Sequence, residues 1–132
     1  PRKTVEVIVL TGDRGLCGAF NSNILKAGQN HIDNIKKEGF NVSISTIGKK
    51  SLDYFRRRGV QIRKSWTGLS GRVTYSDAQE ISNDIKENYI NEIIDEVTLI
   101  YNEFKSMVAQ KISIVRLLPL TPIGSEEKEA TA

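Results

Sequence analysis

The residues best suited to chemistry lie in one glycine-rich stretch near the start of the chain. Gly12, Gly15 and Gly18 recur at every third position, after the apolar segment Val5–Leu10 and before a helix-like segment. A strand, a glycine-rich turn and a helix together form the phosphate-binding element of many α/β proteins, in which the helix N-terminus binds the anion. A nucleotide site is therefore the first hypothesis for this stretch.

The spacing of the glycines argues against a nucleotide. A dinucleotide-binding turn has the pattern G-x-G-x-x-G, in which the second glycine lets the backbone approach the pyrophosphate. Here the pattern is G-x-x-G-x-x-G, and the next expected strand ends in Thr46-Ile47-Gly48, with no carboxylate to hold a ribose. We therefore favour a turn that shapes the backbone or contacts a partner. A small nucleotide-binding α/β enzyme that uses Gly12–Gly18 is the alternative.

The charges in this turn indicate a partner. Asp13 suits a helix N-terminus, whereas the positive charge of Arg14 opposes the helix dipole there. A local mismatch of this kind points to a role outside the helix, such as contact with an anionic surface. The alternative is a solvated arginine paired with Asp13, which contributes little to stability.

The remaining candidates for chemistry do not form a catalytic or metal-binding set. The chain has one histidine, His31, and one cysteine, Cys17, so a usual zinc site and an internal disulfide are both excluded. His31 lies on an apolar helical stripe and is expected to pack rather than to catalyse. The neighbouring carboxylates Asp95 and Glu96 would point to opposite faces of a strand, so they do not form an acid–base pair.

A second short segment has a superficial likeness to a phosphate-binding loop. Gly48-Lys49-Lys50-Ser51 resembles the end of a P-loop, but Ser43 stands where the first glycine is required, and Lys-Ser does not directly follow Gly48. We expect these lysines to be solvated residues that open a short helix.

Charge is distributed unevenly along the chain, whose net charge is +3. Residues 1–72 carry 14 Lys and Arg against 5 Asp and Glu, whereas residues 73–132 carry 5 against 11. The basic half therefore favours an acidic partner. A nucleic-acid-binding module is a further alternative, because several basic residues lie close in the sequence to an aromatic residue that could stack on a base. These residues are Arg56–Arg58, Arg63, Lys64 and Trp66. No recognised nucleic-acid-binding module accompanies these charges, so we expect no nucleic-acid partner.

The alternation of strand-like and helix-like segments predicts an α/β fold with a Rossmann-like open sheet. Strands are expected at residues 4–10, 41–47, 60–63, 96–101 and 112–118. Helices are expected from between Gly15 and Asn21 to about Lys37, after Gly48 as far as Arg58, and from a capping box at Ser76–Gln79 to about Tyr89.

The connections between these elements predict the topology. Right-handed crossovers give the strand order 3-2-1-4-5, with helices on both faces. The last strand is expected to be antiparallel, because the short connection before it cannot hold a crossover helix. Residues 1–122 would form a single domain and residues 123–132 a polar, flexible tail.

The segment Leu10–Asn23 resembles the strand, turn and helix start of the gamma subunit of F-type ATP synthases, in which a strand ends in D-R-G-L-C-G followed by small residues and Asn. Leu117-Leu118-Pro119-Leu120 is similar to the family's segment after the last strand. The resemblance covers almost the whole chain. It implies a non-catalytic subunit of the central stalk, the rotor of the proton-translocating synthase, with a Rossmann-like domain that holds no nucleotide, cofactor or metal.

The same resemblance implies partners and a location. The domain would dock the epsilon subunit and the c ring, with membrane contact only through that ring, and take part in coupling ion flow to ATP synthesis. The turn would face acidic loops of the beta subunits, in the ring that they form with the alpha subunits. The residues of this partner-contact turn are Gly12, Asp13, Arg14, Gly15, Leu16, Cys17 and Gly18.

This sequence departs from the full family pattern in two respects. Neither long coiled-coil helix of the family is present, so the chain is expected to be the isolated globular domain. The cysteine pair that plastid members carry after the L-L-P-L segment is also absent. A bacterial origin follows as the expectation, with a peripheral location at the cytoplasmic face of the inner membrane.

Overall fold

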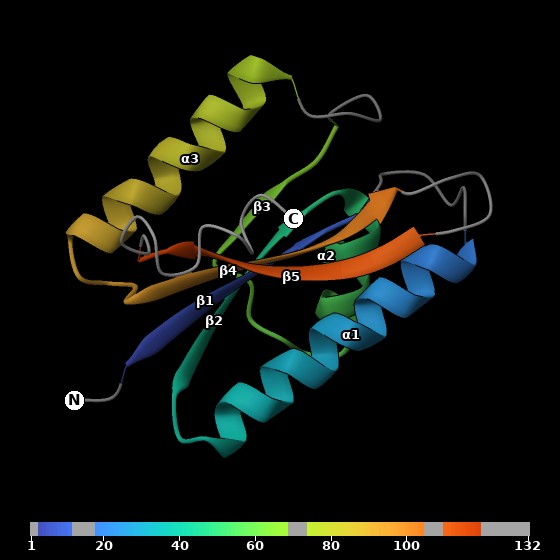
Figure 1. The fold of residues 1–132 in the computed structure, drawn as a ribbon, viewed down its shortest axis with the longest axis horizontal. Coiled ribbons are helices and arrows are strands. Elements are labelled where there is room, and N and C mark those ends of the chain that lie inside the picture. Colours follow the sequence, from blue (N-terminus) through green and yellow to red (C-terminus); the bar gives the residue numbers. More distant parts are fainter. Residues whose placement is uncertain (1–2, 12–17, 69–73, 105–109, 120–132) are drawn as a thin grey trace.

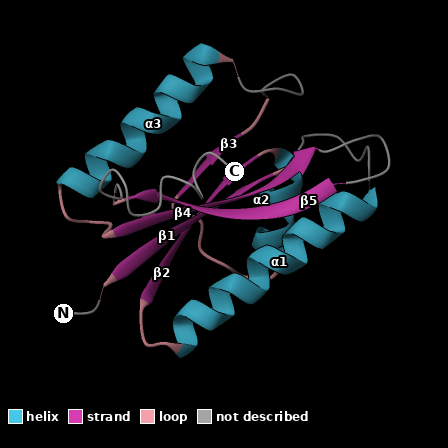
Figure 2. Cartoon of the chain, in the orientation of Figure 1, coloured by secondary structure: helices cyan, strands magenta, loops and turns pink. Residues whose placement is uncertain are grey.

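The computed structural model describes residues 3–11, 18–68, 74–104 and 110–119, which form one mixed sheet with helices on both faces (Figures 1 and 2). The predicted tail and most of the predicted turn lie outside the described residues. The elements, in chain order, are β1 (Thr4–Leu10), α1 (Gly18–Lys37), β2 (Asn41–Ile47), α2 (Lys49–Arg57), β3 (Lys64–Trp66), α3 (Tyr75–Ile90), β4 (Glu96–Phe104) and β5 (Gln110–Leu118).

The sheet has the predicted topology. Its strand order is β3-β2-β1-β4-β5. β1 lies between β2 and β4 and pairs parallel with both, so that Val7 is opposite Ile44 on one side and Thr98 on the other. β4 and β5 pair antiparallel, as the short connection between them required.

Each face of the sheet contributes to its own hydrophobic core. Because side chains alternate along a strand, Val5, Val7 and Val9 of β1 face α1 and α2, whereas Ile8 faces α3. The expected apolar stripe of α1 is confirmed at Ile24, Ile32 and Ile35, which are all buried. Figure 1 shows α1 and α2 on one side of the sheet and α3 alone on the other.

The expected third strand was misplaced. The alternation of Val60 and Ile62 predicted a strand at residues 60–63, but β3 pairs with β2 through Lys64–Trp66. Val60 and Ile62 pack instead against the core beneath α1 and α2. Their apolar character reflects this packing of a connection between α2 and β3.

The start of α3 also differs from the prediction. The capping box is formed by Thr74 and Asp77, two residues earlier than the expected Ser76–Gln79. The Thr74 hydroxyl accepts a hydrogen bond from the Asp77 amide at 3.1 Å, and the Asp77 carboxylate accepts one from the Thr74 amide at 3.0 Å. The Asp77 side chain therefore makes the second hydrogen bond of the capping box, and it also places a negative charge at the positive end of the helix dipole.

An irregularity in the last strand pair redirects two apolar side chains. Both strands are longer than predicted, and the pairing shifts between Val97, which is opposite Leu118, and Thr98, which is opposite Arg116. Leu117 is therefore the extra residue of a β-bulge. As a result, Leu117 and Leu118 both pack toward the α3 side of the sheet.

Candidate interaction surfaces

The structure places both ends of the predicted partner-contact turn. The chain leaves β1 at Thr11, and Gly18 begins α1. Gly12, Asp13, Arg14, Gly15, Leu16 and Cys17 lie outside the described residues. Their role as a contact surface therefore stays a prediction, whereas the elements on either side of them can be described in detail.

At the carboxyl edge of the sheet, the chain segments that leave β1 and β2 are in close contact. The Thr11 amide donates to the Ile47 carbonyl at 2.8 Å, and the Gly48 amide donates to the Trp66 carbonyl at 2.8 Å. Gly48 has a φ of 100°, and a Cβ atom there would lie 2.0 Å from the Thr11 carbonyl oxygen. Gly48 thus allows two backbones to meet, and Lys49 opens a short helix, as expected.

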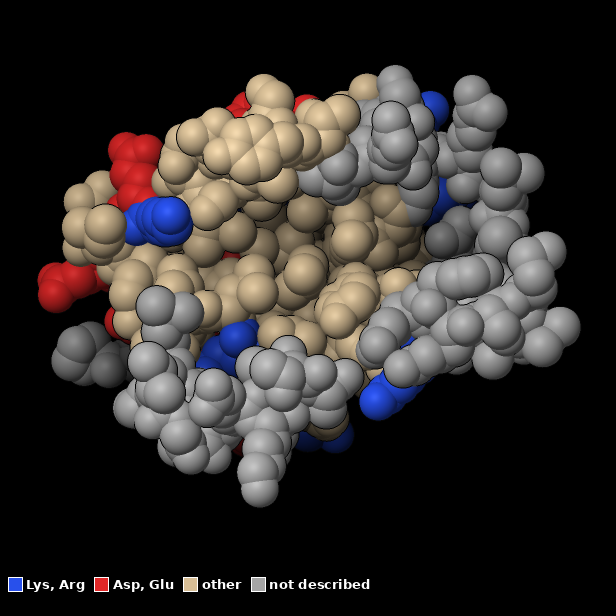
Figure 3. All heavy atoms as spheres, turned by 45° about the horizontal axis from the view of Figure 1, so that its top comes forward, with Lys and Arg blue, Asp and Glu red and all other residues tan. Residues whose placement is uncertain are grey.

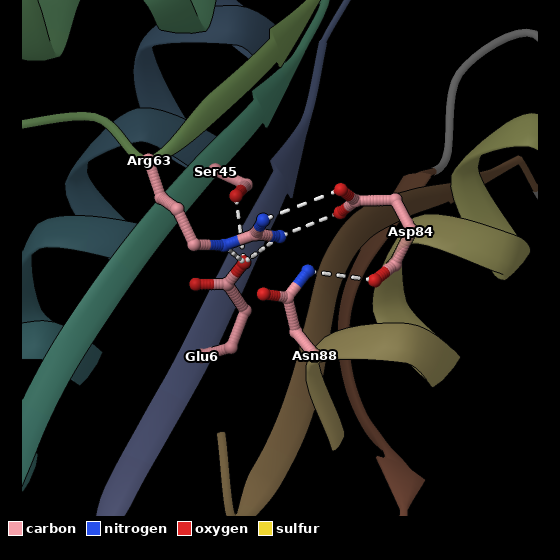
Figure 4. Close-up of polar contacts among 5 residues, drawn as sticks. All are labelled: Glu6, Ser45, Arg63, Asp84 and Asn88. Atoms are coloured by element: carbon pink, nitrogen blue, oxygen red, sulfur yellow. Dashed lines mark hydrogen bonds and ion pairs between the residues drawn. The ribbon is translucent and has the colours of Figure 1, made fainter. Parts of the chain in front are cut away.

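A buried ion cluster connects the sheet to α3 (Figure 4). Glu6 is fully buried in the central strand. Its Oε2 atom accepts hydrogen bonds from Ser45 Oγ at 2.6 Å and from Arg63 Nε at 2.8 Å. The same guanidinium donates to Asp84 Oδ2 on α3 at 2.7 Å. Burial opposes the charge on Arg63, but the hydrogen bonds to Asp84 and Glu6 outweigh it and raise the pKa of Arg63.

This cluster was not predicted from the sequence. Arg63 was considered only as part of a basic patch, and Glu6 only as a residue of an apolar strand. The one indication of the cluster in the sequence is Glu6 itself, because a charged side chain inside a buried strand requires a counter-charge. Since Glu6 and Asp84 both pair with Arg63, the arrangement ties α3 to the sheet.

An apolar groove lies between α3 and the sheet, with a volume of about 500 Å³. Figure 3 shows this hollow, and uncharged side chains make up most of the described surface around it. The bulge in β5 brings Leu117 and Leu118 into its wall. Lys86 is its single charged lining residue among those described, so the groove suits apolar contact and not acid–base chemistry. The other residues that line it are Leu10, Ile47, Ala78, Ile81, Ser82, Ile85 and Leu99.

His31 lies at the rim of a second hollow, of about 470 Å³, on the opposite face of the sheet. Burial lowers the pKa of its imidazole, and the nearby carboxylates of Glu96 and Glu38 partly offset this effect. The histidine lies on α1 and is half-buried, as expected for a packed residue. Asp95 and Glu96 serve different partners: Asp95 Oδ2 accepts from the Thr4 amide at 2.8 Å, and Glu96 pairs with Lys3 at 3.0 Å.

Three of the basic residues considered for nucleic-acid binding, Arg56, Arg63 and Lys64, line one hollow of about 450 Å³. Arg56, Arg57 and Arg58 are exposed at the end of α2, and Arg58 stacks on Tyr54 at 3.9 Å from the ring centroid. Arg63 also belongs to the ion cluster. Trp66 is only 7% exposed, so its ring is not available to stack on a base. The geometry therefore removes the aromatic residue on which this alternative depended.

The described part of the chain holds neither a metal-binding cluster nor a helix able to cross a membrane. No group of three or more His, Cys, Asp or Glu side chains there is arranged to hold a metal ion. None of the described helices combines the length and the apolar character that a membrane span requires.

Comparisons with known proteins identify the family. The family model described as ATP synthase matches residues 1–132. The chain is 41% identical over 122 residues to the ATP synthase gamma chain of Gloeothece citriformis, which covers 92% of this chain and 39% of that relative. The gamma chain of Syntrophobacter fumaroxidans is 38% identical over 127 residues, with coverage of 96% and 44%. The chain belongs to the ATP synthase gamma chain family.

Solved structures agree with membership of the gamma chain family. The fold superposes on a chain of the Tetrahymena thermophila mitochondrial ATP synthase, in a structure of its central stalk and c ring, with a TM-score of 0.74 and 25% identity. That match covers 90% of this chain and 51% of the other. A chain of the Euglena gracilis mitochondrial ATP synthase rotor shares the fold with a TM-score of 0.65. The chain spans about two-fifths of the length of the curated gamma chains that it matches.

Proposed function

We propose that this chain is the globular domain of a central-stalk gamma subunit and acts as a non-catalytic part of the rotor of a proton-translocating ATP synthase. The observation that carries this proposal is the match of all 132 residues to the family, together with superposition on a chain from a central-stalk structure. In this role the domain docks the epsilon subunit and the c ring and helps to couple ion flow to ATP synthesis.

The partner-contact turn is proposed as the surface that meets the ring of alpha and beta subunits. Arg14 lies in this turn, four residues before Gly18 begins α1, and from the sequence we expect its positive charge to be unfavourable near the helix N-terminus. An acidic loop of a beta subunit would supply a counter-charge for Arg14. The domain would then lie at the cytoplasmic face of a bacterial inner membrane and contact that membrane only through the c ring.

The test uses the gamma subunit that carries this domain, assembled with its partners. Arg14→Gln removes the charge and keeps a polar side chain, and Arg57→Gln is the matched control at an exposed position on α2. We expect Arg14→Gln to weaken binding to the ring of alpha and beta subunits and to lower ATP-driven proton uptake, whereas Arg57→Gln leaves both unchanged.

Two results would contradict the proposal. Equal effects of Arg14→Gln and Arg57→Gln would show that the turn makes no specific contact. Stoichiometric binding of ATP, ADP or NAD to the isolated domain, measured by calorimetry, would instead support the nucleotide-binding alternative.

A further inference from the structure

The first turn of α2 is capped by a side chain from outside the helix. Its N-cap residue is Gly48, which has no side chain to make a cap hydrogen bond. The amide of Ser51, the third residue of the helix, donates instead to Thr11 Oγ1 at 2.9 Å. An N-cap side chain normally accepts from this amide. Thr11, which follows β1, thus takes the place of the side chain that Gly48 lacks.

The hydroxyl of Ser51 completes this arrangement. Ser51 is fully buried. Its Oγ accepts a hydrogen bond from Thr11 Oγ1 at 3.0 Å. Its own proton faces the carbonyl oxygens of Gly48, Ile47 and Val9, which lie 3.1, 3.2 and 3.3 Å away. One pair of hydroxyls therefore joins the ends of β1 and β2 to the start of α2.

The lack of a side chain at Gly48 is what allows this contact. A Cβ atom at that position would lie 3.0 Å from Thr11 Oγ1 as well as 2.0 Å from the Thr11 carbonyl oxygen. The Thr11 amide is also bonded to the Ile47 carbonyl. Thr11 is thus held through its amide and its hydroxyl while its carbonyl packs on Gly48, which fixes the point at which the chain leaves β1.

We propose that Thr11, Gly48 and Ser51, named here the Thr11–Ser51 bracket, are positioning residues for the partner-contact turn. This inference rests on the proposed function. Because Gly12 is bonded directly to Thr11, a fixed Thr11 limits the directions in which the following turn can leave the sheet. A turn that leaves the sheet from a fixed point would lose less conformational entropy when it meets its partner, and it would therefore bind more tightly.

The test compares the same substitution at two threonines of the gamma subunit, the half-buried Thr11 and the buried Thr46. Thr11→Val removes the capping hydroxyl and keeps the shape of the side chain, and Thr11→Ser restores the hydroxyl. Thr46→Val is the matched control, because Thr46 is buried on the neighbouring strand and its Oγ1 has no partner among the described residues. The measurements are the thermal midpoint and the dissociation constant for the ring of alpha and beta subunits.

We expect Thr11→Val to raise this dissociation constant about fivefold, the factor that corresponds to one neutral hydrogen bond. Thr11→Ser and Thr46→Val should both bind like the wild type. If Thr11→Val does not fold at the assay temperature, Ser51→Ala removes the other hydroxyl of the bracket and is expected to have the same effect. A cap that only stabilised α2 would lower the thermal midpoint and leave the binding of the folded protein unchanged.

The outcomes separate this inference from the proposed function. Normal binding by Thr11→Val beside weakened binding by Arg14→Gln would overturn the bracket and leave the contact turn in place. Normal binding by both variants would overturn the contact turn and the bracket together. Weakened binding by Thr11→Ser or by Thr46→Val would show that the hydroxyl at position 11 is not the determinant.

Discussion

Glu6 shows how one side chain can organise several elements of this domain. It lies in the central strand, and burial of an unpaired carboxylate would cost several kcal/mol. Arg63 compensates for this cost and reaches Asp84 on α3 at the same time. A buried cluster of this kind contributes specificity of arrangement more than net stability, because desolvation consumes most of the attraction.

Removing only the positively charged member of this cluster is expected to destabilise the fold strongly. Arg63→Met should lower the free energy of unfolding by about 3–5 kcal/mol, because it leaves the Glu6 carboxylate buried without a counter-charge. Adding Glu6→Leu to Arg63→Met should recover most of this loss. Urea denaturation measures both effects.

The control is the exposed ion pair between Lys3 and Glu96, for which Lys3→Met should cost less than about 1 kcal/mol. A similar small cost for Arg63→Met would contradict the role assigned to the cluster.

His31 is expected to make stability depend on pH. Burial lowers the pKa of His31 in the folded chain below the ordinary value of 6.5, so the unfolded chain binds more protons between the two values. The contribution of His31 is therefore fully present above about pH 6.5 and is lost as the pH falls through the lowered pKa. The charged groups beside it are Glu38, directly after α1, Glu96 on β4 and Arg116 on β5.

The measurement is the free energy of unfolding at about pH 8 and about pH 5 for the wild type and for His31→Gln, which does not titrate. The wild type should lose more stability on acidification than the variant. An equal loss would assign the pH dependence to the carboxylates instead.

Among the elements, α3 shows why local patterns mislead at helix ends. Ser76 and Gln79 have the residue types of a capping box, but so do Thr74 and Asp77. The earlier pair forms the cap for two reasons. The Asp77 carboxylate, at the third helical position, accepts a hydrogen bond from the Thr74 amide, and its negative charge interacts favourably with the positive end of the helix dipole. Residue types alone do not distinguish two overlapping boxes.

Thr74→Ala is expected to lower the free energy of unfolding by about 1 kcal/mol, since it removes the acceptor for the Asp77 amide. Thr74→Ser should be close to the wild type. Ser76→Ala should have little effect, because Ser76 lies inside the helix and is exposed. Chemical denaturation of the three variants tests this, and a larger loss for Ser76→Ala than for Thr74→Ala would restore the original assignment.

The last strand pair and β3 show a second limit of element-level prediction. The alternation of Val60 and Ile62 is typical of a strand, yet both side chains fill the core from a connection. The bulge at Leu117 has no signal in the sequence, because one extra residue in a ladder is defined only by its partner strand.

At the level of the complete domain, the two faces of the sheet are covered unequally. α1 and α2 cover one face, whereas α3 alone covers the other and leaves the apolar groove beside it (Figures 1 and 3). The opposite charges of the two halves of the sequence also lie within one folded unit, in which Arg63 from the basic half pairs with Asp84 from the acidic half. Part of the charge asymmetry therefore stabilises the fold and is not available to a partner.

The order of strands, the antiparallel last pair and the layering of helices followed from the sequence alone. They depend on hydrophobic periodicity, on the length of connections and on the handedness of crossovers, which are all local or nearly local properties. The family resemblance required only two segments of the sequence, Leu10–Asn23 and Leu117–Leu120, and the comparisons confirm it.

The ion cluster, the cap that Thr11 provides for α2 and the groove beside α3 emerged only from the folded chain. Each joins residues that are far apart in the sequence, such as Thr11 and Ser51 or Glu6 and Arg63. No pattern within one segment specifies such pairs, because they depend on which strand ends the topology brings together. The sequence therefore supplies the architecture and the family, whereas the contacts that hold the edge of the sheet require all the elements in place.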